Sequence, residues 1–306
     1  MDVRSFLQVS VVMLLWAACY PLITIGIAHA PHLSFATLRA VIAAVVLLGI
    51  AAWLGCAWPR GLRAWLSILI VGLGATSLGF LGMFHAAEFI APGLATVIAS
   101  TQPLLAALLA SMVLGERLPR QGRLGLLIGF AGVLVIVAPK LFDPGAGTYL
   151  VGIAYVVLAA LGVTVSNVII KRIAGTLDGL MVMGLQILFG AVPLAIIAFA
   201  TEDPAAIEWE PEFIVALIGL SLFGTAAVYW LWIDLLERVP LSQANAFSFL
   251  VPVLGLAMGV AFFGEAIDWI QGVGMLIAVS GVVLVATGTR PTRDIAPAQQ
   301  ARLSGQ

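Results

Sequence analysis

Charge is the property that this sequence has least of. Lysine, arginine, aspartate and glutamate together make up 9% of its 306 residues, while 62% of the residues are hydrophobic. A soluble domain carries about 25% charged residues, because its surface faces water. This chain cannot cover such a surface, so the composition predicts an integral membrane protein.

Cysteine and histidine are scarce as well. The two cysteines, Cys19 and Cys56, both lie in apolar runs, which excludes a disulfide scaffold and a paired-cysteine metal site. His29, His32 and His85 show no metal-ligand spacing. A P-loop is missing, so direct drive by ATP is not expected, and no basic cluster suggests nucleic acid. We find no catalytic dyad at membrane depth and expect a protein that is not an enzyme and has no cofactor.

Long apolar stretches fill most of the chain. About 20 such residues form a helix that crosses the ~30 Å hydrocarbon core of a bilayer. Ten stretches qualify, at residues 6–28, 35–55, 64–84, 93–114, 122–139, 150–170, 180–200, 213–233, 242–263 and 270–288. The first is too long for the apolar part of a signal peptide, so we expect it to be retained. The polar tail, 290–306, is predicted to be disordered and cytoplasmic.

The layout of the first half returns 149 residues later. The matched pairs are Thr76 with Thr225, Glu88 with Glu237, Pro103 with Pro252, Gly115-Glu116 with Gly264-Glu265, and Gly132 with Gly281. We therefore expect two five-helix repeats, 1–140 and 147–289. Because five is odd, the second repeat enters from the other side of the membrane. The predicted fold is all-α, with ten transmembrane helices as two inverted repeats.

The basic residues predict the orientation. Of the 14 lysines and arginines, all except Lys140 and Arg39 lie in links or tails on the same side as the N-terminus. Positively charged loops stay in the cytoplasm. We therefore expect a multi-pass protein of the cell inner (plasma) membrane with both termini cytoplasmic.

The paired prolines fall near the middle of the fourth and ninth predicted helices. Proline frees the carbonyl four residues earlier, here those of Ala99 and Ser248, and a freed carbonyl in hydrocarbon needs a partner. Polar side chains lie beside both prolines: Ser100, Thr101, Gln102, Asn245 and Ser248. They could line a polar cavity between two kinked helices, the interpretation we favour, or they could repair the kinks.

Aromatic residues mark the first and eighth predicted helices. Trp16 and Tyr20 are four residues apart and can share one face, and the positions that align with them in the second repeat lie near Ser166 and Asn167. These rings could stack on an organic substrate, or they could pack in the ordinary way. Tyr229 belongs to an aromatic patch with the same two interpretations.

Arg39 is the one basic residue inside a predicted helix, and it aligns with Gln186. A charge inside the membrane is costly and is a functional hypothesis by default. Arg39 could hold a substrate carboxylate, pair with an acid, or extend to the membrane surface as an anchor.

His85 and Glu88 end the third predicted helix on the external side, opposite the aligned Asp234 and Glu237. Histidine titrates near neutral pH, so His85 could couple transport to protons. Solvated helix ends would explain all four residues equally well.

Two further features are interpreted as structural. Glu116 and Glu265 each follow a glycine at the end of a helix, where a carboxylate can accept hydrogen bonds from the start of the next helix. The Gly125-x-x-x-Gly129 and Gly255-x-x-x-Gly259 spacings allow close helix contact but specify no partner.

Several short motifs, doubled and in order, resemble a known family. They are Trp16-Ala17, Leu38-Arg39, Ile90-Ala91-Pro92, Gln102-Pro103, Gly115-Glu116-Arg117-Leu118, Gly129-Phe130-Ala131-Gly132-Val133, Pro252, Gly264-Glu265 and Gly281-Val282-Val283. Residues 7–288 resemble the drug/metabolite transporter superfamily, specifically its EamA-type ten-helix transporters. The resemblance implies export of small metabolites, often amino acids, from a bacterial inner membrane through a cavity lined by helices 1, 3, 4, 6, 8 and 9. Ala17 and Gln186 depart from the family pattern and leave the substrate open.

Together these observations predict a secondary transporter that works by alternating access and exports small metabolites. An uptake carrier or a channel-like protein for a small organic solute is the alternative. The expected partners are a small-molecule substrate and the lipid bilayer, with protons as a candidate coupling ion and either a monomer or a homodimer. The candidate substrate-cavity residues are Trp16, Tyr20, Arg39, Thr76, His85, Gln102, Pro103, Asn167, Gln186, Tyr229, Asn245, Ser248 and Pro252.

Overall fold

The computed structural model describes residues 1–85, 89, 99, 102–116, 118–141, 149–264 and 268–288. These residues form helices joined by short links. The first half contains α1 (Val3–Ile27), α2 (His32–Trp53), α3 (Leu62–Val71), η1 (Gly72–Leu78), α4 (Gly79–His85), α6 (Gln102–Leu109), η3 (Ala110–Leu114) and α7 (Arg120–Leu141). The second half contains α8 (Tyr149–Ile173), α9 (Gly179–Thr201), η4 (Pro204–Ala206), α10 (Pro211–Ser221), η5 (Leu222–Ala227), α11 (Val228–Arg238), α12 (Leu241–Ala246), η6 (Phe247–Phe249), α13 (Leu250–Phe263) and α14 (Trp269–Gly288).

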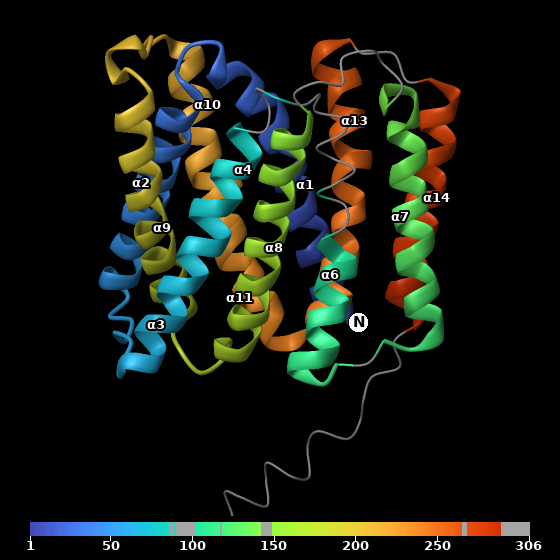
Figure 1. Cartoon of the computed structure of the whole chain (residues 1–306). Helices are drawn as coiled ribbons and strands as arrows, with labels where there is room; N and C mark the ends of the chain where they lie inside the picture. The colour runs from blue at the N-terminus through green and yellow to red at the C-terminus, as the bar shows by residue number, and fades with distance from the viewer. Residues whose placement is uncertain are drawn as a thin grey trace, which may run out of the picture.

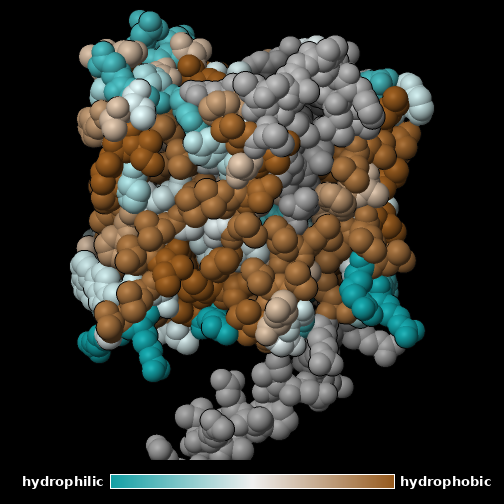
Figure 2. Space-filling view, in the orientation of Figure 1, coloured by the Kyte–Doolittle hydropathy of each residue, from teal (hydrophilic) through white to brown (hydrophobic). Residues whose placement is uncertain are grey.

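The helices stand side by side as membrane crossings (Figure 1). Eight in the described part of the chain are long and apolar enough to span a bilayer, and the apolar helix Gln102–Leu114 is shorter. With α7, these make ten helices in the described part of the chain. Hydrophobic side chains cover the middle of the visible face, between hydrophilic margins (Figure 2). The predicted all-α membrane fold, with two inverted five-helix repeats, is confirmed. Lys140 lies in the last turn of α7 rather than in an external loop.

The two repeats begin on opposite sides of the molecule. α1 begins at the lower edge of Figure 1, beside the N label, whereas α8 begins at the upper edge. We call the lower side the N-terminal face and the upper side the opposite face. α2 packs against α9, and α7 packs against α14, so the second and fifth helices each contact their counterpart in the other repeat.

Two transmembrane helices contain a π-helical segment at matching positions. η1 interrupts the third helix between α3 and α4, and η5 interrupts the eighth between α10 and α11. The repeat offset superposes the two segments. π-Helical turns are rare and occur often at functional sites. In the ninth helix the α-helical geometry is interrupted by the 3₁₀ segment η6, which lies just before Pro252.

Glycine permits a very close contact between α7 and α14. A Cβ added to Gly132 would lie 2.3 Å from the Ala278 nitrogen, and one added to Gly281 would lie 2.3 Å from the Gly129 nitrogen. The Gly125-x-x-x-Gly129 spacing thus has a definite partner, which the sequence left open. This contact joins the last helices of the two repeats.

Carboxylates from one repeat cap helices of the other. Glu116 accepts hydrogen bonds from the Leu241 nitrogen at 2.9 Å and from the Ser242 nitrogen and hydroxyl at 3.1 and 2.9 Å, at the start of α12. The predicted structural role of Glu116 is confirmed, but its partner is not α7, the next helix along the chain. Folding brings the ends of the fourth and ninth helices together, and that approach has no local sequence signal. Glu265 lies outside the described residues.

Candidate functional site

Arg39 of α2 points into the protein and not to the membrane surface. Its side chain is 3% exposed. Nε donates a hydrogen bond to the Thr225 hydroxyl at 2.7 Å, and Nη2 donates to the Gly224 carbonyl at 3.2 Å. The guanidinium carbon lies 4.6 Å from the centroid of the Phe80 ring, within the range of a cation–π interaction. Arg39 therefore holds the π-helical segment η5 of the other repeat.

The third guanidinium nitrogen of Arg39, Nη1, makes no hydrogen bond to the described residues. Nη1 is buried, and no carboxylate of the described residues lies within 4 Å of the guanidinium. A buried charge without a counter-charge costs several kcal/mol in a medium of low polarity. This group is thus ready to bind one more acceptor, and an anionic acceptor would stabilise it most.

Side chains from three other transmembrane helices surround the guanidinium. Cys19 of α1 lies 3.9 Å from Nη2, and Phe80 comes from α4. Tyr229, four residues after Thr225, is partly buried and interacts electrostatically with Arg39 and Cys19. Sequence reasoning treated Cys19 only as a small hydrophobic residue. The first, second, third and eighth helices meet here, at the boundary between the repeats.

The second repeat contains an uncharged counterpart of this arrangement. Gln186 of α9 is fully buried and accepts a hydrogen bond from the Thr76 hydroxyl of η1 at 3.0 Å. Its amide nitrogen contacts the Met183 sulfur at 3.8 Å. The π-helical segments η1 and η5 are therefore each held by the second helix of the other repeat. Only the Arg39 side carries a charge, which distinguishes the two halves chemically.

Trp16 belongs to a chain of contacts that ends at Asn167. The Trp16 ring centroid lies 5.3 Å from that of Trp232, and the Trp232 indole nitrogen donates to the Asn167 side-chain oxygen at 2.9 Å. Trp232 thus connects Trp16 of the first repeat with Asn167 of the second. Trp232 and Asn167 are 3% and 4% exposed, so their contact packs α11 against α8. The side chain of Tyr20 lies outside the described part of the chain.

The polar residues of the ninth helix bind their own backbone. Asn245 donates to the Leu241 carbonyl at 3.1 Å, and Ser248 donates to the Asn245 carbonyl at 2.7 Å. Neither bond goes to the Ser248 carbonyl that Pro252 frees, and a role of these side chains in lining a cavity stays a prediction.

The fourth helix packs against the ninth through α6 and α12. Gln102 and the buried Pro103 begin α6. Ser100 and Thr101, which come just before them, lie outside the described residues. A shared cavity between the two prolines is therefore a prediction that the described residues do not test.

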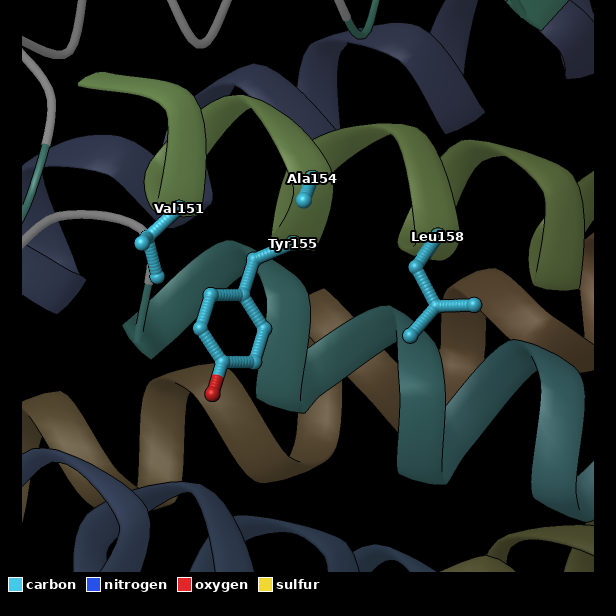
Figure 3. A pocket seen from close by; sticks show the side chains of 4 residues that line it. All are labelled: Val151, Ala154, Tyr155 and Leu158. Carbon is cyan, nitrogen blue, oxygen red and sulfur yellow. The ribbon is translucent and has the colours of Figure 1, made fainter.

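A pocket of about 390 Å³ lies against α8, in the half nearer the opposite face. Figure 3 shows its four labelled side chains projecting from one side of the helix. They are Val151, Ala154, Tyr155 and Leu158. The Tyr155 ring lies edge-on to the His85 ring of α4, with 4.8 Å between centroids. Nothing in the sequence distinguished Tyr155, because its neighbours are ordinary apolar residues of a membrane helix.

Polar contacts join the helix ends at the N-terminal face. Lys171 of α8 donates to the Leu236 carbonyl, in the last turn of α11, and at 2.9 Å to the Val239 carbonyl, just after α11 ends. Arg172 donates to the Val113 carbonyl of η3 at 3.1 Å. Asp234 accepts from Arg238 at 2.7 Å, and both are partly exposed, as expected for a solvated helix end.

Comparison with known proteins agrees with this architecture. The EamA-like transporter family matches residues 4–138 and 150–287. The uncharacterized transporter YvbV from Bacillus subtilis is 26% identical over 299 residues, covering 96% of this chain and 95% of that protein. A probable amino-acid metabolite efflux pump from Salmonella typhimurium is 28% identical over 305 residues, with 96% of each chain covered. A solved crystal structure shares the fold, with a TM-score of 0.82 at 20% identity over 94% of this chain and 99% of that one. This chain therefore belongs to the EamA-like transporter family and is a multi-pass membrane transporter.

Proposed function

We propose that this protein exports small metabolites that carry a carboxylate, such as amino acids or related compounds, across the inner membrane by alternating access. The observation that carries the proposal is the Arg39 guanidinium, buried between the repeats with Nη1 unpaired among the described residues. A substrate carboxylate would supply the missing counter-charge. The Salmonella typhimurium relative, which is named a probable amino-acid metabolite efflux pump, agrees with this substrate class.

The guanidinium is oriented before any substrate arrives. Thr225 and Gly224 already bind Nε and Nη2, so a carboxylate that reaches Nη1 does not have to order a flexible side chain, and that lowers the cost of binding. Tyr229 lies close to the guanidinium and would contact the rest of a small organic molecule. We place the substrate beside these residues, at the boundary between the repeats.

Alternating access follows from the architecture that surrounds Arg39. Inverted repeats permit two conformations of similar energy that open to opposite faces. The matched segments η1 and η5 interrupt the third and eighth helices at equivalent depths, where those helices could bend. The excess of lysine and arginine at the N-terminal face supports the proposal that this face, with both termini, lies in the cytoplasm.

The test uses purified protein in proteoliposomes. Candidate metabolites come from a comparison of overexpressing and deletion cells, and counterflow then identifies those that are carried. The amide analogue of a carried metabolite, which lacks the carboxylate, should compete poorly against it. Arg39→Gln should abolish transport of the carboxylate. Arg63→Gln, at an exposed position, is the matched control and should behave as wild type.

Two outcomes would contradict the proposal. An Arg39→Gln protein that transports at the wild-type rate and still rejects the amide would exclude Arg39 as the carboxylate group. Flux that does not saturate, without acceleration by substrate on the far side, would favour the channel-like alternative. Accumulation in the inward direction would favour an uptake carrier.

A further inference from the structure

Two histidines and a glutamate form a connected cluster at the opposite face. His32 Nε2 lies 3.2 Å from His85 Nδ1, and the two rings stack with 5.4 Å between centroids. On its other side, His32 Nδ1 lies 3.3 Å from Glu202 Oε1. The His32 and Glu202 side chains are 21% and 9% exposed. The cluster joins the start of α2, the end of α4 and the residue that follows α9.

Glu202 caps the start of α2. It accepts hydrogen bonds from the Leu33 nitrogen at 2.8 Å, the Ser34 nitrogen at 2.7 Å and the Ser34 hydroxyl at 2.8 Å. Donors at a helix start favour the charged form of an acid. Because Glu202 acts only as an acceptor, its contact with His32 requires a proton on Nδ1 of that ring.

This requirement fixes where further protons can go. With His32 neutral and protonated on Nδ1, its Nε2 is an acceptor, so His85 donates from Nδ1. One added proton can sit on His32 Nε2, with the His85 proton moved to Nε2, and the contacts among Glu202, His32 and His85 are kept. A second added proton places N–H groups on both facing nitrogens, and the bond between the rings is lost. The geometry therefore has a place for one added proton within this chain of contacts and none for a second.

We propose that Glu202, His32 and His85 form the proton-binding site that couples transport to a proton gradient. The inference rests on the proposed transport function and extends it to the driving ion. The cluster includes residues of both repeats, so its hydrogen bonds respond when one repeat moves against the other. His85 also packs edge-on against Tyr155, which lines the pocket on α8, so a change at the histidines reaches that pocket directly.

Other titratable groups lie near the cluster and are part of its electrostatics. Arg39 follows two turns further along α2, and Tyr155 faces His85 from α8. The end of α1 contributes His29, which contacts Glu208 at 3.4 Å. Glu212 begins α10, which packs against α2. Glu88 lies outside the described residues.

The first test separates coupling from transport. Counterflow needs no gradient, whereas accumulation driven by a pH difference requires the coupling site. His32→Gln should keep counterflow and lose pH-driven accumulation. His29→Gln, on the same face but outside the cluster, should keep both. Normal pH-driven accumulation by His32→Gln with an unchanged pH profile would overturn the proposal.

A second measurement uses the unsubstituted protein and does not require transport. Nitrogen-15 NMR of the three histidines, in detergent or nanodiscs, should show one proton bound jointly by His32 and His85 between about pH 5 and 8, with the next bound only at lower pH. Independent titration of His32 and His85 would overturn the proton site, while a failure of counterflow in wild type would instead overturn the proposed transport function.

Discussion

The close contact between α7 and α14 gives the most quantitative prediction, for the substitution Gly281→Ala. The added Cβ would lie 2.3 Å from the Gly129 nitrogen and 2.6 Å from the Gly125 carbonyl oxygen. Ordinary contact begins at 3.4 Å, so the two helices would have to separate by about 1 Å. Both neighbours are backbone atoms, which cannot move aside as a flexible side chain can. Helix separation along this contact is therefore the expected response.

The control lies in the same helix. A Cβ on Gly272 would meet nothing within 4 Å, so Gly272→Ala brings the gain in helix propensity, up to about 1 kcal/mol, without the clash. Overpacking typically costs about 1–3 kcal/mol. Since the propensity gain is common to both variants, we expect Gly281→Ala to be less stable than Gly272→Ala by about 1–3 kcal/mol.

The assay is unfolding by SDS in mixed micelles, followed by far-ultraviolet circular dichroism. The midpoint for Gly281→Ala should fall below that of Gly272→Ala, and Gly132→Ala, the equivalent change in the first repeat, should match Gly281→Ala. Equal midpoints for Gly281→Ala and Gly272→Ala would refute the close approach of α7 and α14.

Three further predictions concern the N-terminal face. Glu116→Gln should lower the free energy of unfolding by about 1 kcal/mol, because it weakens the cap on α12, while the exposed Glu237→Gln should not; equal stability of the two variants would contradict the cap. Cys56 should react with an impermeant maleimide in inside-out vesicles and not in right-side-out ones, and the reverse result would invert the proposed orientation. A hydrogen bond to the Asp178 carboxylate raises the pKa of the Cys56 thiol. The rate of maleimide labelling should therefore rise with pH into the alkaline range, and at one pH it should be higher in Asp178→Asn than in wild type. Equal rates in the two proteins would contradict that bond.

The crossings and the repeat could be predicted because both leave a direct mark on the sequence. Apolar length defines a membrane helix, and pairs such as Pro103 with Pro252 keep a constant offset. The π-helical segments could not be predicted in this way. One wider turn inside a continuous apolar helix changes neither its length nor its composition, so η1 and η5 leave no visible pattern.

The chemistry of the site was predictable for single residues but not for their partners. Arg39 stood out because a charge inside an apolar stretch is rare. Its partner Thr225 is 186 residues away and is an ordinary threonine in the sequence. His32 was counted only as one of three scattered histidines, and Glu202 is one of several acids in its loop. Contacts between repeats depend on packing that no local spacing encodes.

Access to the Arg39 region from both sides of the membrane tests the central claim most directly. In a Cys56→Ser background, Cys19 is the sole cysteine and lies beside the Arg39 guanidinium. Impermeant thiol reagents should modify Cys19 slowly in right-side-out and in inside-out vesicles, and a transported carboxylate should protect it in both. Modification from one side only, or without protection by substrate, would contradict alternating access around Arg39.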